Sequence, residues 1–191
     1  IDRLELIYLV NSWGRELSFI INYLDNKEIK INECKPEDCY NLSELDVSQI
    51  TNLENLFRSS LINDICSMNE INLHDCNISK WDVSNVTNME WMFYKAKYFN
   101  QALNNWDISK VTNLSNMFSY ANNFNKPLNK WNTSNVTNME GMFLKAENFD
   151  SDIGNWNVSK VTNMKGMFLY SRNFNQNINN WDVSNVTNMS K

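Results

Sequence analysis

The sequence has little glycine, proline and histidine, and each scarcity removes a class of function. Its 191 residues include 4 Gly, 2 Pro and 1 His. The glycines are scattered, so the chain has neither a phosphate-binding loop nor a dinucleotide-binding turn. The single histidine, His74, has no second imidazole for a histidine-based metal site and lies in no spacing typical of hydrolases. We therefore predict a protein that is not an enzyme and needs no cofactor or metal.

Long hydrophobic runs are also absent. The longest extends from Leu6 to Val10, whereas a transmembrane helix needs roughly 20 apolar residues. The chain starts at Ile1 rather than Met and shows no signal peptide, so we expect a mature chain or an excised fragment. Hydrophobic residues still make up 42% of the chain and aromatic residues 13%. This composition indicates a folded protein without a transmembrane segment.

Asparagine, by contrast, is abundant, with 36 copies. Many of them belong to a repeat of 25 residues, in which each copy opens with Trp and continues with a near copy of DVSNVTNM. The opening residues are Trp81, Trp106, Trp131, Trp156 and Trp181. An earlier, degraded copy has Leu45 in the Trp position, and the longer step from Leu45 to Trp81 places an insertion near residues 58–73.

The apolar spacing differs between the two halves of each repeat. The first half follows the L-x-x-L-x-L pattern of a short strand, as at Leu103, Trp106, Ile108 and Val111. The second half has spacings of 3, 4 and 7, which is one face of a short helix. Such a unit cannot bury its apolar face alone, so it must stack on its neighbours.

We therefore predict an α/β solenoid. It is a leucine-rich-repeat-like right-handed coil, with a parallel sheet on one side, short helices on the other and strands centred near the residue after each Trp. Thr51, Thr87 and Thr137 lie three residues before Glu54, Glu90 and Glu140, which predicts capping boxes at the helix starts. The period is too short for the four-stranded blade of a WD-repeat propeller.

Two regions make up the predicted domain organisation. Residues 1–40 do not repeat, and their helical and then alternating apolar spacing predicts an N-terminal cap of one helix and one strand. Residues 41–191 form the repeat region of about six coils, of which the first is irregular because of the insertion near 58–73.

All four cysteines precede the regular repeats, at Cys34, Cys39, Cys66 and Cys76. In an exported protein they would form two disulfides, such as Cys34 with Cys39 and Cys66 with Cys76, although three pairings are possible. In a cytosolic protein they would be buried free thiols. A zinc site built from them and His74 lacks the usual Cys pairs.

Stacking turns each repeat position into a column of side chains. With Trp and Val facing inward, the outward column after each Trp contains Asp46, Asp82, Asp107, Asn132, Asn157 and Asp182. Neighbouring columns contain Lys130, Asn155, Asn135 and Lys160. Their polar side chains indicate either a surface for a partner or hydrogen bonds that hold the coils together. A calcium ladder on the aspartates lacks the glycine-rich turns of calcium-binding repeats.

We expect a protein partner to bind where this column changes from Asp to Asn. The expected contact residues are Lys130, Asn132, Asn135, Asn155, Asn157 and Lys160, flanked by Asp82, Asp107 and Asp182. The net charge of the chain is −5, and its Lys and Arg are too scattered for a nucleic-acid interface. The oligomeric state is left open by the sequence.

The units WDVSNVTNMEWMF at 81–93 and FNQALNNW at 99–106 closely resemble the repeats of the BspA-like leucine-rich-repeat surface proteins, a family that includes mycoplasma-type lipoproteins and bacterial adhesins. The resemblance covers roughly residues 42–191. It implies a bacterial protein that is secreted or lipid-anchored at the cell surface, and it implies no catalytic residue. Some members of that family bind host matrix proteins or other bacteria.

Two hypotheses for function follow. The first is a cell-surface or secreted module that mediates adhesion by binding a host protein or another cell-surface protein. The second is an intracellular or structural scaffold that binds a partner from the same cell. Reduced cysteines would favour the scaffold, and disulfides would favour the exported module.

Overall fold

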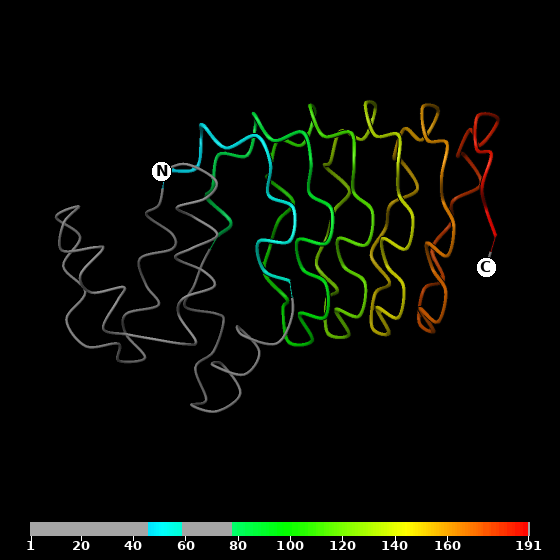
Figure 1. Cartoon of the computed structure of the whole chain (residues 1–191). Helices are drawn as coiled ribbons and strands as arrows, with labels where there is room; N and C mark the ends of the chain where they lie inside the picture. The colour runs from blue at the N-terminus through cyan, green and yellow to red at the C-terminus, as the bar shows by residue number, and fades with distance from the viewer. Residues whose placement is uncertain (1–45, 59–77, 191) are drawn as a thin grey trace, which may run out of the picture.

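The computed structural model describes residues 46–58 and 78–190. These residues form successive coils that stack side by side in a row, from the first coil at 46–58 to the last coil at the C-terminus (Figure 1). In this part of the chain the coils consist of turns and single-residue bridges, with no helix and no extended strand.

The coils are held in register by isolated parallel bridges between equivalent asparagines. Five bridges join the six asparagines in order: Asn52, Asn88, Asn113, Asn138, Asn163 and Asn188. Each bridge after the first therefore links residues 25 positions apart, and the first spans the insertion. The repeat period read from the sequence is confirmed as the register of the stack.

Backbone N–H groups after each bridge alternate between two kinds of acceptor. Every second amide from Met89 to Lys95 donates to a carbonyl of the next coil, with N···O distances of 2.8–3.0 Å. The intervening amides from Met92 to Ala96 donate to the carbonyl three residues earlier, at 3.0–3.3 Å. Half of the amides thus close turns within a coil and half join the coil to its neighbour.

The predicted helices are wrong, and two left-handed residues in each coil explain why. Trp91 and Lys95 have φ angles of 59° and 60°, and Asn116 and Tyr120 repeat this pattern with 54° and 61°. A right-handed helix cannot continue through such residues. The spacing of 3 and 4 arises instead from consecutive turns closed by i to i−3 hydrogen bonds.

The predicted strands at the Trp positions are also wrong. The amide of Trp106 donates to Leu103 O at 3.0 Å and that of Val111 to Ile108 O at 2.9 Å. The backbone therefore turns twice where an extended strand was expected. The prediction of an α/β solenoid with a parallel sheet and helices is overturned by these findings, because the described residues form stacked coils of turns.

The predicted capping boxes are wrong for the same reason, since there is no helix start to cap. The Oγ1 atom of Thr87 donates to the Thr51 carbonyl of the preceding coil at 3.1 Å, and Thr112 and Thr137 continue this ladder at 3.2 Å each. Threonine at this position joins neighbouring coils through both its hydroxyl and its backbone amide.

The core is a set of aromatic columns that run through the stack. Trp106, Trp131 and Trp156 are each less than 5% exposed, which confirms that the Trp side chains face inward. Their indole Nε1 atoms donate to a buried carbonyl of the preceding coil, as Trp131 does to Leu103 O at 2.9 Å. The rings of Phe118 and Phe143 stack at 5.7 Å with an angle of 5° between their planes.

The last described coil packs on the coil before it, and its opposite face is exposed in this structure. Trp181 is half-buried, and Val183 and Met189 are 41% and 58% exposed. Phe168, Trp181 and Met189 contribute to an open apolar hollow of about 650 Å³ on this end face.

Within the described ranges there is no helix with the length and hydrophobicity needed to cross a membrane.

Several predictions concern residues outside the described ranges. They are the N-terminal cap at 1–40, most of the insertion near 58–73, and Cys34, Cys39, Cys66 and Cys76 with their pairing.

Candidate interaction surface

The columns that the sequence predicts as a partner surface lie on one turn of each coil. These turns, at residues 80–85, 105–110, 130–135, 155–160 and 180–185, are here called the polar strip. Lys130, Asn132, Asn155, Asn157 and Lys160 are exposed, and Asn135 is half-buried. The strip therefore presents amide and ammonium groups to solvent along the stack.

The Asp/Asn column of the strip shapes the turn that follows each Trp. The Oδ1 atom accepts a hydrogen bond from the backbone amide two residues later, at 3.0 Å for Asp82 and 2.9 Å for Asp107. Asn132 accepts in the same way from Ser134 at 3.2 Å. Asp and Asn are both able to make this turn because it needs one side-chain oxygen.

The same hydrogen bonds stabilise the charged form of the aspartates. The Ser84 hydroxyl and then its backbone amide lower the pKa of Asp82 below its ordinary value. Ser109 and Ser184 act in the same way on the pKa of Asp107 and of Asp182. Asp82, Asp107 and Asp182 are exposed, so these carboxylates remain open to solvent while they hold the turn.

Lysine and asparagine alternate in two further columns of the strip, at 85, 110, 135, 160 and 185 and at 80, 105, 130 and 155, and they contact each other between coils. The Nζ atom of Lys110 lies 2.6 Å from Asn85 Oδ1, and that of Lys160 lies 2.7 Å from Asn135 Oδ1. Lys130 Nζ makes a similar contact with Asn105 Oδ1 at 3.2 Å. The structure thus brings together the predicted residues Lys160 and Asn135.

Amide nitrogens in the strip donate to backbone carbonyls of the preceding coil. Asn135 Nδ2 donates to Ser109 O at 2.8 Å, and Asn155 Nδ2 donates to Asn129 O at 2.7 Å. These two bonds, and the contact of Lys160 with Asn135, each join residues that lie 25 or 26 positions apart in the sequence. Among the predicted contact residues, Lys130, Asn135, Asn155 and Lys160 thus bond the preceding coil, whereas Asn132 and Asn157 bond backbone amides of their own coils.

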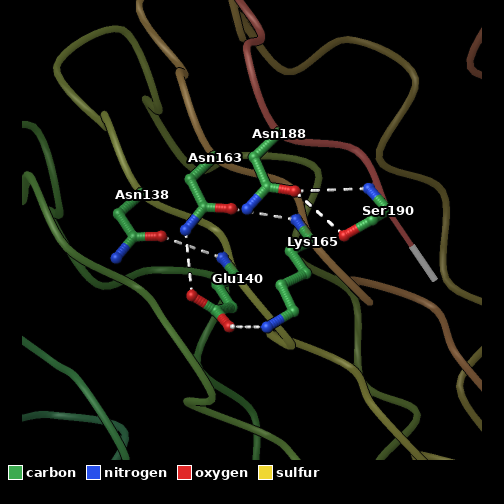
Figure 2. Close-up of polar contacts among 6 residues, drawn as sticks. All are labelled: Asn138, Glu140, Asn163, Lys165, Asn188 and Ser190. Carbon is green, nitrogen blue, oxygen red and sulfur yellow. Dashed lines mark hydrogen bonds and ion pairs between the residues drawn. The ribbon is translucent and has the colours of Figure 1, made fainter.

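A separate column of asparagines, outside the strip, lies at the bridges between coils, and its side chains hydrogen-bond to glutamate. Asn163 Nδ2 donates to Glu140 Oε2 of the preceding coil at 2.9 Å, while Asn163 Oδ1 accepts from the Lys165 amide at 3.1 Å (Figure 2). Lys165 Nζ lies 3.6 Å from Glu140 Oε1. Asn163 thus binds the preceding coil through Glu140 and closes its own turn through the Lys165 amide.

A third surface feature, a line of aromatic and cationic side chains on the turns after the bridges, was not predicted from the sequence. Here called the Tyr/Lys ridge, it consists of Arg58, Trp91, Tyr94, Lys95, Tyr120, Lys145 and Tyr170. In the aligned repeats, Lys and Tyr alternate at positions 95, 120, 145 and 170, and this alternation could have indicated the ridge.

No group of three or more His, Cys, Asp or Glu side chains that could hold a metal ion occurs among residues 46–58 and 78–190. The five aspartate and asparagine side chains of the strip column, and Asp46 in the first coil, bond backbone amides within their own coils.

Comparison with known families decides the membership of this chain. A family model described as "Mycoplasma protein of unknown function, DUF285" matches residues 30–143, 63–166 and 127–191. The chain belongs to this family. The three matches overlap and together extend over the repeats and the residues just before them. No curated protein and no solved structure matches the chain.

Proposed function

We propose that this member of the Mycoplasma family is a non-catalytic binding module that is secreted or held at the cell surface and attaches to a protein partner through its polar strip. The partner would be a host extracellular matrix protein or another cell-surface protein. The resemblance of the repeat to BspA-like surface proteins supports this location and role, and the matching family carries no assigned function.

The observation that carries the proposal is the array of polar groups along the strip, several of which hydrogen-bond to the preceding coil. Lys160, Asn135 and Asn155 are each fixed by a hydrogen bond to the preceding coil. Side chains that are already ordered lose less conformational entropy when a partner binds. Repeat proteins commonly use such continuous surfaces for extended contacts.

The expected contact centre lies where asparagine replaces aspartate. Asn132 and Asn157 contribute no charge to the column, while Lys130 and Lys160 stand beside them. A partner segment rich in Asp or Glu would meet two ammonium groups there, and desolvating an amide costs less than desolvating a carboxylate. The flanking Asp82, Asp107 and Asp182 would repel the same segment and so set its register along the stack.

Charge reversal of two lysines tests this proposal. We expect Lys130→Glu with Lys160→Glu to reduce attachment to immobilised extracellular matrix and to epithelial cells by about tenfold or more. The matched control, Lys97→Glu with Lys126→Glu, makes the same charge change outside the strip. Exposed contacts of this kind contribute about 1 kcal/mol or less to stability, so both variants should keep their melting temperatures.

Attachment through exposed charges should also weaken as salt is raised, because screening acts over about 8–10 Å at physiological ionic strength. Unchanged attachment of the folded Lys130/Lys160 variant would contradict the role of the strip. Failure of an antibody or an added protease to reach the protein on intact cells would contradict the surface location and favour an intracellular scaffold.

A further inference from the structure

The Tyr/Lys ridge is a continuous surface that the proposed function does not use. The Arg58 guanidinium lies 4.7 Å above the Trp91 ring and 5.2 Å above the Tyr94 ring. Tyr94 contacts Tyr120 edge to face at 5.7 Å. Lys145 Nζ then lies 4.8 Å from the Tyr120 ring and 5.5 Å from the Tyr170 ring. The ridge therefore extends without a break across five coils.

One position of the repeat, here called the ridge position, has a backbone conformation that is unfavourable for the residues that occupy it. Lys95, Tyr120, Lys145 and Tyr170 have φ angles between 55° and 63°, where glycine and asparagine are the usual residues. Four positions earlier in each repeat the φ angle is also positive, and there the chain uses Asn55, Asn116, Gly141 and Gly166 in four of the five described coils.

This contrast indicates that the ridge side chains are kept for their own chemistry. Replacing Lys or Tyr by glycine would relieve the backbone strain at each position. None of the four coils makes that replacement at the ridge position. Strained residues that retain large side chains are typical of binding surfaces.

The ridge groups are open to solvent and carry positive charge. Arg58 and Lys95 are exposed, Tyr170 is 58% exposed, and Tyr120 and Lys145 are half-buried. The carboxylate of Glu90, next to the ridge residue Trp91, accepts hydrogen bonds from the Trp91 indole at 2.8 Å and from Asn113 of the next coil at 3.0 Å. Aromatic rings and cations are thus presented together.

We propose that the Tyr/Lys ridge binds an anionic polysaccharide along the axis of the stack. The ridge position repeats its residue type every second coil, with Lys at 95 and 145 and Tyr at 120 and 170. Two coils extend on the order of 10 Å, because bridged backbones lie about 4.8 Å apart. A disaccharide of an extended acidic polysaccharide has a similar length, which places one sulfate or carboxylate at each lysine and one sugar ring at each tyrosine.

The chemistry of both partners fits this register. An ammonium group held over a ring keeps N–H donors for a sulfate or carboxylate oxygen, and a tyrosine ring offers an apolar face to the C–H groups of a sugar. A disordered acidic peptide has no fixed repeat of this length. The ligand class and the surface both differ from those of the polar strip.

Binding of defined polymers to the full 191-residue chain tests the proposal. The probes are heparin as a sulfated glycan, hyaluronan as a carboxylated glycan, neutral dextran, poly-L-glutamate and oligo-dT. We expect heparin or hyaluronan to bind. Heparin carries carboxylates as well as sulfates, so binding of heparin alone shows that sulfate is required, whereas binding of hyaluronan shows that carboxylate is sufficient. Dextran should not bind, and the affinity for the acidic glycan should fall with salt.

Ridge variants then localise the site. We expect Tyr120→Gly with Lys145→Gln to weaken glycan binding by about tenfold or more. Glycine suits the φ angle of 61° at position 120, so the variant removes the ring without adding backbone strain. If the double variant does not fold, the exposed Tyr170→Gly is the substitute, with an expected loss of about threefold or more.

The matched control is Lys130→Gln with Lys160→Gln on the polar strip, which should leave glycan binding within about twofold. The proposal is overturned if neither acidic glycan binds, if poly-L-glutamate or oligo-dT binds as tightly, or if the folded ridge variants bind as the unmodified chain does. Because strip and ridge variants are separate, loss of protein attachment and loss of glycan binding are distinguishable outcomes.

Discussion

Glu140 and Asn163 join two successive coils through a side-chain hydrogen bond of 2.9 Å between Asn163 Nδ2 and Glu140 Oε2 (Figure 2). Asn163 at the same time supplies the acceptor for the Lys165 amide at 3.1 Å. One half-buried asparagine therefore closes its own turn and binds the preceding coil. The equivalent Asn113 and Glu90 repeat the contact at 3.0 Å.

We expect Asn163→Ala to destabilise the protein more than Glu140→Ala. The first change leaves the Lys165 amide without its acceptor and removes one contact of the Glu140 carboxylate, at a cost of about 1–3 kcal/mol. The second removes the acceptor of the Asn163 amide group, which water can replace, and an exposed ion pair with Lys165, at about 0.5–1.5 kcal/mol. Glu140→Gln keeps the acceptor and should be nearly neutral. Urea unfolding of the three variants and of the Asn163/Glu140 double mutant gives the coupling energy, and a coupling of zero would contradict the contact.

Trp131→Ala should cost about 3–5 kcal/mol, because it empties a core site shared by adjacent coils. Trp131 is 4% exposed and its ring stacks on Trp156 at 6.1 Å. Trp131→Phe keeps a ring but removes the bond to Leu103 O, so a smaller loss of about 1–3 kcal/mol is expected. A melting-temperature shift of less than a few degrees for Trp131→Ala would mean that the Trp column is not the core.

Two glycines one repeat apart offer a matched pair of substitutions. Gly141 and Gly166 have φ angles of 57° and 59°. Alanine at either position costs about 1–2 kcal/mol of backbone strain. At position 141 the added Cβ would also clash with Asn116 Oδ1, so that the Asn116 side chain would have to rotate away, whereas at 166 its nearest neighbour lies 3.9 Å away. Thermal unfolding should therefore show a slightly larger loss for Gly141→Ala, and a larger loss for Gly166→Ala would contradict this packing.

The aspartates of the polar strip should make stability depend on pH in the acid range. Hydrogen bonds from the serine two residues later lower the pKa of Asp82, Asp107 and Asp182 in the folded chain. Their contribution is present above the unfolded value of about 3.9 and is lost as the pH falls through the lower folded pKa. Melting temperatures measured from pH 7 to pH 3 should show this loss.

The variant that carries Asp82→Asn, Asp107→Asn and Asp182→Asn is the control for that measurement. Asparagine keeps the acceptor, as Asn132 shows with a bond of 3.2 Å to the Ser134 amide, but it does not titrate. The triple variant should retain its stability at pH 7 and lose less of it on acidification. If the triple variant loses as much stability on acidification as the unmodified chain, the groups whose titration causes the loss are not these three aspartates.

The period, the inward Trp side chains and the exposed strip could be predicted from the sequence because they depend on columns of like residues. Trp131 and Asn132 recur at fixed spacing with opposite polarity, and burial follows polarity directly. The register of the bridges follows from the same spacing, since Asn138 and Asn163 differ by one period.

The backbone path could not be derived from apolar spacing alone. A series of turns closed by i to i−3 bonds repeats its buried positions almost as a helix does, so Leu114 and Met117 fit both. The positive φ angle at Tyr120 could not be predicted, because tyrosine does not favour that conformation. A signal was available at the other left-handed position, because Gly141 and Gly166 occupy the same place in successive repeats and interrupt any helix there.

The most direct test of the stacked-coil architecture is the detection of hydrogen-bond partners by through-bond scalar couplings in NMR. The structure places the Phe143 amide 2.9 Å from the Met167 carbonyl of the next coil, so a coupling between Phe143 nitrogen and the Met167 carbonyl carbon is expected. A coupling from Phe143 nitrogen to the Met139 carbonyl carbon, four residues earlier, would show a helix in this segment and contradict the account.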